Sequence, residues 1–103
     1  MNLEALAESG GMDVEDLEML LAVFKPSVTD ALGKLKAAAA ANDMEGARFA
    51  LHKIAGSSAP LFGIGEVNTI ARAGETTIRD GGTVDAAALA QQIEQILTAA
   101  EVL

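Results

Sequence analysis

The sequence contains no cysteine, no tryptophan and no tyrosine among its 103 residues, and it has only three phenylalanines. Without thiols, disulfides, thiolate catalysis and cysteine-ligated zinc or iron–sulfur sites are excluded. The scarcity of aromatic rings argues against a protein that stacks nucleic-acid bases. Cations are also few, since seven Lys and Arg against fifteen Asp and Glu give a net charge of −8. A chain this acidic is not expected to bind a nucleic-acid backbone or an anionic membrane surface.

Long apolar runs are absent as well, because no stretch reaches the roughly 18 residues that a membrane span needs. The opening residues, Met1 to Glu4, lack the basic segment of a signal peptide, so we expect a cytoplasmic protein. No nucleotide-binding loop of the G-x-x-x-x-G-K-S/T type is present, so the chain is not expected to be a kinase by itself. Asp and Glu are scattered without a tight cluster, so no metal site is predicted.

What the chain does have is alanine, with half its residues apolar and only two prolines. Alanine is the strongest helix former, so this composition favours an all-α fold. Glycine, asparagine and proline divide the chain into five segments, which predict helices over about 2–9, 13–41, 44–59, 64–80 and 84–101. The last four are long and amphipathic with short connections. They predict an antiparallel four-helix bundle with a short extra N-terminal helix, as one domain over residues 1–103.

The second segment carries its apolar residues at steps of three or four, which is typical of one helix face. These residues are Val14, Leu17, Leu21, Phe24, Val28, Leu32, Leu35 and Ala39. Asp13 is expected to cap the helix at its start. Pro26 interrupts the pattern, but the phase continues across it. We therefore expect one kinked helix, with two helices on a shared axis as the alternative.

The third segment contains the only histidine, His52. On a helical wheel, the buried stripe of this segment consists of Ala47, Leu51, Ile54, Ser58 and Leu61. His52 lies about 140° from Ala47, so its imidazole is expected to face solvent. A lone surface histidine usually has no function, but Gly56 follows it by one turn at a cost of about 1 kcal/mol relative to alanine. A small residue beside an exposed imidazole gives clearance, and nearby cations would stabilise a phosphoryl group during transfer.

The run His52-Lys53-Ile54-Ala55-Gly56-Ser57-Ser58 resembles the H-x-L-K-G-S-S signature of histidine-containing phosphotransfer (HPt) domains. Chain length, acidity and helix order agree with that family, and residues 2–24 look like its short first helix, glycine turn and entry into the second helix. The resemblance implies a four-helix bundle that carries a phosphoryl group on His52 between receiver domains in a phosphorelay. It implies response-regulator receivers and a hybrid histidine kinase as partners, no cofactor apart from magnesium in the receiver, and a monomer.

One departure from the family pattern concerns a cation. The family usually has a lysine three residues after the histidine, where it helps to neutralise the phosphate, and here that residue is Ala55. Lys53 lies about 100° around the helix from His52 and is not equivalent. Arg48, one turn before His52, and Arg72, on the following helix, are the other candidates for this role.

A second departure is a spacing. The family's glycine ten residues after the histidine is replaced here by Phe62, and Gly63 follows. A one-residue insertion around Pro60 accounts for the shift. Many members place an acid or amide twenty-two residues after the histidine to orient the ring, and with the insertion this position becomes Glu75. A carboxylate there would accept a hydrogen bond from Nδ1–H of His52 and leave Nε2 free to attack.

Two side chains near the predicted site have open interpretations. The same shift places Arg72 one turn before Glu75, close to the ring, although the two residues can equally form an ordinary solvated pair. Phe49 lies beside His52 on the wheel. It is expected either to belong to a docking patch or to pack under the second helix. Phe24 is expected in the core.

The leading hypothesis is therefore a phosphoryl carrier without kinase activity of its own. One alternative, motivated by Ala55, is an HPt-like docking module that binds receivers or a kinase but is not phosphorylated. Another is a structural bundle that self-associates through its alanine-rich helix faces. An enzyme of another class has little support, because only one base of the histidine type is present.

Overall fold

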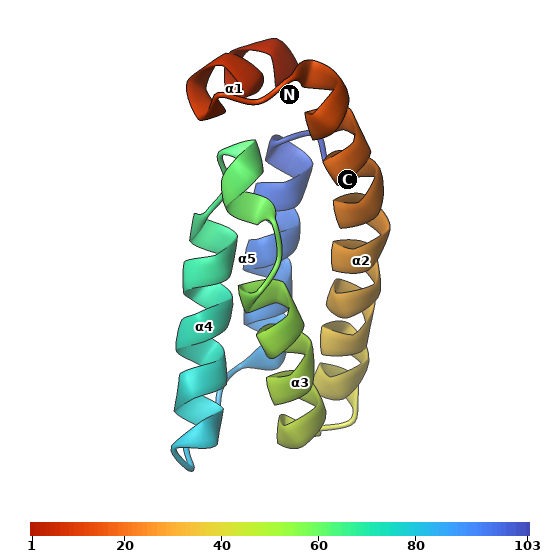
Figure 1. Cartoon of the computed structure of the whole chain (residues 1–103). Helices are drawn as coiled ribbons and strands as arrows, with labels where there is room; N and C mark the ends of the chain where they lie inside the picture. Colours follow the sequence, from red (N-terminus) through yellow and green to blue (C-terminus); the bar gives the residue numbers. More distant parts are fainter.

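The chain folds into five α-helices and one 3₁₀ turn, described for all residues from Met1 to Leu103 in a computed structural model (Figure 1). In chain order these are α1 (Leu3–Gly10), α2 (Val14–Ala40), α3 (Met44–Ala55), η1 (Ala59–Phe62), α4 (Glu66–Arg79) and α5 (Ala86–Ala99). Helices α2 to α5 run alternately up and down, and α1 lies across one end of them (Figure 1). The predicted all-α bundle with a short extra N-terminal helix is confirmed.

Helix α2 continues through Pro26, so the prediction of one helix rather than two is confirmed. The proline has no N–H, which leaves the carbonyl of Ala22 without its partner one turn later. Both residues are exposed, so solvent has access to that carbonyl. Asp13 occupies the N-cap position, but its side chain makes no capping hydrogen bond. The helix is therefore held mainly by the packing of its apolar face.

Helix α3 ends earlier than predicted, at Ala55 rather than at Ser58 or Ala59. The cause is local. Gly56 is a weak helix former, and Pro60 has no N–H to donate to the carbonyl of Gly56. The chain instead forms η1, where the proline lies in the first turn and its missing N–H costs nothing.

This change of path corrects part of the predicted buried stripe. Leu61 is 43% exposed and Ser58 is half-buried, so the prediction that both face inward is wrong. Phe62 is buried in place of Leu61 and stacks on Phe24 with a ring-centroid distance of 5.1 Å. The rest of the stripe is buried as predicted: Ala47, Leu51 and Ile54.

Two glycines allow the chain to follow this path. Gly63 ends η1 at a φ of +73°, in the left-handed region that favours glycine. Gly74 is buried in α4, where an added Cβ would lie 3.0 Å from side-chain carbons of Leu51 in α3 and Leu89 in α5. Glycine at this position lets α4 approach both neighbours closely. The interior formed in this way is one cluster of 23 buried apolar residues.

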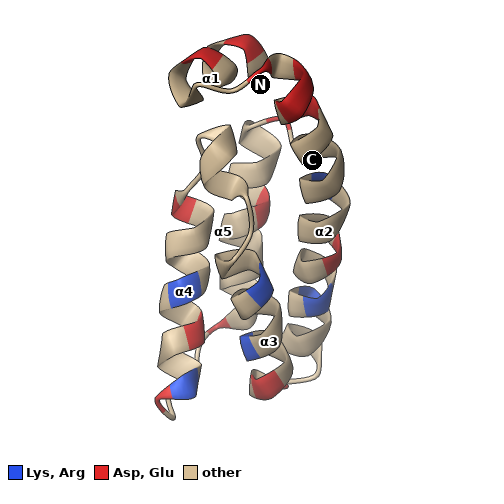
Figure 2. Ribbon diagram, in the orientation of Figure 1, with Lys and Arg blue, Asp and Glu red and all other residues tan.

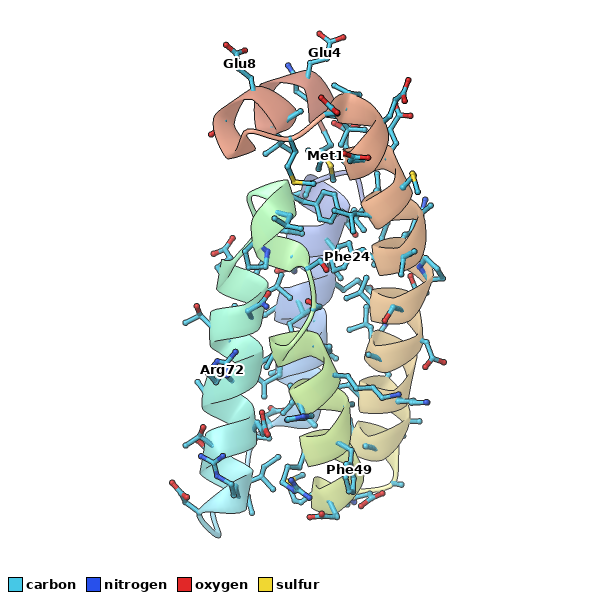
Figure 3. The ribbon with its side chains drawn as sticks, viewed as in Figure 1. Met1, Glu4, Glu8, Phe24, Phe49 and Arg72 are labelled. Carbon is cyan, nitrogen blue, oxygen red and sulfur yellow. The ribbon has the colours of Figure 1, made fainter.

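Charge is distributed unevenly along the bundle. The first 18 residues carry six Asp or Glu and no Lys or Arg, and Figure 2 shows this acidic end around α1 and the start of α2. The two cations of α3, Arg48 and Lys53, lie in the other half of the bundle, and Arg72 lies on α4 beside them (Figures 2 and 3). No helix has both the length and the apolar character needed to cross a membrane.

Candidate functional site

His52 lies in the last turn of α3 and points away from the core. Its side chain is 69% exposed, as the helical wheel predicts. The side chains of α3 that face inward are small or aliphatic and hold the helix against its neighbours. The imidazole is therefore presented to solvent from a helix whose opposite side is fixed in the core, and a partner can reach the ring without any part of the bundle opening.

Glu75 of α4 is the side chain that contacts the ring. Its Oε1 lies 2.8 Å from Nδ1 of His52, while the Glu75 residue is only 8% exposed. A carboxylate can only accept a hydrogen bond, and a buried one needs a donor. The arrangement therefore favours a proton on Nδ1 and, in the neutral ring, an unprotonated Nε2 that faces solvent. The two residues are in contact, as the one-residue shift inferred from the sequence predicts.

Arg72 precedes Glu75 by one turn of α4 and points to the same part of α3. Its Nη2 donates a hydrogen bond of 3.1 Å to the backbone carbonyl of Ala55. Ala55 lies one turn after His52, at the position where the resemblance leads us to expect a lysine. The Ala55 side chain is buried, and the cation that contacts the backbone at this position is Arg72 of α4 (Figure 3).

Arg48 is held on the other side of His52. Its Nε donates to Oε1 of Glu45 at 3.1 Å, and its guanidinium lies over the ring of Phe49 at 4.7 Å from the centroid. The hydrogen bond with Glu45 raises the pKa of the Arg48 guanidinium and lowers that of the Glu45 carboxyl. Arg48 is therefore already paired, and its approach to a group on His52 would compete with Glu45.

Phe49 does not pack under α2. It is 58% exposed and lies on the outside of α3 (Figure 3). It borders a groove of about 490 Å³ between α2 and α3, together with Lys53 of α3 and Lys34 of α2. Lys53 thus faces this groove, whereas Lys34 pairs with Asp30 at 3.1 Å. The surface next to His52 combines an exposed aromatic ring with lysines.

Gly56 follows His52 by one turn and has open space outside it. An added Cβ would meet only the carbonyl oxygens of His52, at 3.6 Å, and of Lys53, at 3.9 Å, both ordinary contacts. Its φ of −92° is open to any residue. Gly56 is the C-cap of α3, so the expectation that it lies inside the helix at a cost in stability is wrong. Clearance for a partner at this position stays a prediction.

Asn68 of α4 is a further residue at this site, and it was not predicted from the sequence. Its Nδ2 donates to the carbonyls of Ala55, at 2.9 Å, and Ser57, at 3.0 Å, just beyond His52 on α3. The available signal was its spacing, because Asn68, Arg72 and Glu75 follow each other at steps of four and three. Such steps place three side chains on one helix face.

Residues 19–102 match the Hpt domain family, from the first half of α2 to the end of the chain's last turn. Helix α1 lies outside the matched range. Neither the curated proteins nor the solved structures gave a significant match. Since the match covers well over half of the sequence and the four bundle helices agree with it, the chain belongs to the Hpt domain family.

Proposed function

We propose that this chain is a phosphoryl carrier that accepts its phosphoryl group on Nε2 of His52. Membership in the Hpt family implies a phosphotransfer role in a phosphorelay. The observation that supports His52 as the carrier is its hydrogen bond to Glu75, because it leaves the solvent-facing nitrogen free. The ring is also the only imidazole in the chain.

The transfer begins when a phosphorylated receiver docks over His52. The lone pair of Nε2 attacks phosphorus, an N–P bond forms, and the bond from phosphorus to the receiver's aspartyl oxygen breaks as the carboxylate leaves. The Nδ1 proton stays on the ring, which becomes cationic, and Glu75 stabilises that charge through the same hydrogen bond. The reverse step passes the group to another receiver. Magnesium belongs to the receiver's site in this scheme, so the chain itself needs no cofactor.

Arg72 is the cation that we assign to the transferred group. Its guanidinium uses one nitrogen on the Ala55 carbonyl and retains further N–H groups for phosphoryl oxygens. In this role it replaces the lysine that the family usually carries at the position of Ala55. Arg48 would contribute only by leaving Glu45, and Lys53 points to the groove instead.

The receiver would dock on the face that contains Phe49 and the groove between α2 and α3. An exposed phenylalanine supplies apolar contact area, and Lys53 provides positive charge at the groove, where Lys34 is paired with Asp30 and Asp43 also lies. Gly56 would let the receiver's backbone approach the ring. The complex would contain one copy of this chain, with a hybrid histidine kinase as the upstream source of phosphate.

The test is transfer from a labelled phospho-receiver, with magnesium, to the wild type and to His52→Gln. We expect label on the wild type only, stable in base and lost in acid, with both proteins folded because His52 is exposed and glutamine keeps an NH₂ donor for Glu75. Label on His52→Gln would contradict the assignment.

The burial of Ala55 where a lysine is expected favours one alternative, a docking module without chemistry. In that case receivers would bind the wild type and His52→Ala equally well, and neither protein would acquire acid-labile phosphate. Binding without transfer across a panel of receivers would decide for this alternative.

A further inference from the structure

The end of α3 beyond His52 is held partly by side chains of α4. The carbonyls at a helix C-terminus lack intrahelical donors. His52 and Ile54 find theirs in the N–H groups of the following turn. No backbone N–H donates to the carbonyls of Ala55 or Ser57, and both accept from Nδ2 of Asn68.

The amide of Asn68 has only one orientation that fits this place. Both neighbours on the α3 side are carbonyl oxygens, so the NH₂ group must face them, and each of its two hydrogens has a separate acceptor. The Oδ1 atom then points the other way, where it is buried without a hydrogen-bond partner. A buried acceptor without a partner lowers the stability of the fold. The contribution of Asn68 therefore lies in the two hydrogen bonds that its NH₂ group donates to the α3 side.

Asn68 is the first member of a row of three side chains on α4. The row runs antiparallel to α3: Asn68 bonds to Ser57 and Ala55, Arg72 bonds to Ala55, and Glu75 bonds to His52. The two ends of the row therefore act on the same turn of α3. A shift of that turn along or around its axis would disturb the hydrogen bonds of Asn68 together with the hydrogen bond between His52 and Glu75.

The orientation of the His52 ring depends on this alignment of α3 with α4, because few other contacts fix the ring. Its side chain is largely exposed, and the hydrogen bond to Glu75 is the one that it makes. Hydrogen bonds weaken steeply with distance and angle, so a displaced backbone at His52 would weaken the bond at Nδ1. The proton would then distribute between the two ring nitrogens, and Nε2 would be less often free.

We propose that Asn68 is a positioning residue for phosphorylation of His52, which keeps the last turn of α3 in register with Glu75. This inference rests on the proposed carrier function. Asn68 does not touch the phosphoryl group; it acts through the backbone of Ala55 and Ser57.

The test uses the full chain and potassium phosphoramidate, a small donor that needs no docking surface. Nε2 of His52 forms the N–P bond as the P–N bond of the donor breaks and ammonia leaves. The variant Asn68→Leu keeps the branching and the number of heavy atoms of the side chain but removes both donors. Thr69→Ala is the matched control, since Thr69 is the exposed next residue of α4 and its hydroxyl bonds only to Gly65 at the start of that helix. Intact mass gives the rate, and ¹⁵N signals of the ring give the tautomer.

We expect Asn68→Leu to be modified about tenfold more slowly, since small displacements of reacting groups have effects of this order. Its ring signals should move toward a mixture of the two tautomers. Thr69→Ala should match the wild type in both respects, and Asn68→Gln, which keeps an NH₂ donor, should recover part of the rate. A purely structural role would lower the unfolding temperature of Asn68→Leu and leave the ring signals of the folded protein unchanged.

Wild-type rate and wild-type ring signals in Asn68→Leu would overturn the inference. If the leucine variant does not fold, Asn68→Ser, which also lacks the amide, is judged by the same two criteria. A wild-type chain that takes no phosphoryl group from either donor would instead contradict the carrier function, and the ring signals would still decide the role of Asn68.

Discussion

Helix α4 meets its two neighbours, α3 and α5, in different ways. On the α3 side, Asn68, Arg72 and Glu75 reach across and form hydrogen bonds to the turn that carries His52. On the α5 side, no side-chain hydrogen bond or ion pair joins the two helices. The contact there is made by half-buried apolar side chains, which leave two surface grooves of about 590 and 500 Å³ that meet at Ile70.

The difference between these interfaces has a physical meaning. Apolar packing is favourable but non-directional, so it brings α4 and α5 together without fixing their register closely. Hydrogen bonds require a distance and an angle, so the polar row fixes α4 against α3. The candidate site lies at the interface where register is specified. The comparison predicts that changes on the α3 side alter chemistry, whereas changes on the α5 side alter stability alone.

The largest effect is expected from Glu75→Leu, which removes the acceptor at Nδ1 of His52. Because Glu75 is buried, an apolar leucine is expected to leave the protein folded while phosphorylation slows by about a hundredfold. Glu75→Gln keeps an acceptor oxygen and should fall between leucine and the wild type. The check is the rate of phosphorylation by phosphoramidate, measured together with the thermal unfolding of each variant. A leucine variant as fast as the wild type would refute the role of Glu75.

The next effect concerns Gly74, where α4 approaches both neighbours. Gly74→Val places a branched side chain against Leu51 and Leu89 and should lower the free energy of unfolding by about 1–3 kcal/mol. The matched control is Ala73→Val, the same kind of change at an exposed neighbour on the same helix. Denaturant unfolding measures both. If both variants lost the same free energy of unfolding, the close approach of the helices at Gly74 would not limit packing.

A smaller effect is expected from Ile70→Ala on the α5 side. Ile70 is only half-buried, so the free energy of unfolding should fall by about 1 kcal/mol. The same change at the core residue Ile93 should lower it by about 2–5 kcal/mol. The phosphorylation rate of folded Ile70→Ala should equal that of the wild type. A slower rate in this variant would show that the contact of α4 with α5 also controls the site. That result would contradict the difference drawn between the two interfaces.

The smallest effect concerns the exposed pair of Glu45 and Arg48. The hydrogen bond from Arg48 lowers the pKa of Glu45 below its ordinary value. The ionised carboxylate therefore contributes stability at neutral pH, and the contribution is lost as the pH falls through the lowered pKa. The unfolding temperatures of the wild type and Glu45→Gln should differ slightly at neutral pH and converge in acid. A difference that grows in acid would have the wrong sign.

Part of the candidate site could be predicted from the sequence because it depends on one helix at a time. The outward direction of His52 follows from 3.6-residue periodicity. The partnership with Glu75 required more, since it depends on the length of the connection around Pro60, and the family spacing supplied that correction. The end of α3 was predicted too late, so Leu61 was placed inside although Phe62 takes that position.

Other features depend on the packing of two helices against each other. Asn68 could not be linked to Ala55 and Ser57 from the sequence, because the partners are backbone carbonyls, which every residue possesses. The same holds for Arg72, whose side chain was predicted near the ring without an identified acceptor.

The sequence by itself determined the fold class, the number of helices and the face of α3 that carries His52. These properties follow from local preferences and from the periodicity of apolar residues, which act within one segment. Only the tertiary structure decided which atoms of α4 meet the last turn of α3. That outcome depends on the register of two antiparallel helices, and the register is fixed by hydrogen bonds between residues distant in the chain, such as Asn68 with Ala55 and Glu75 with His52.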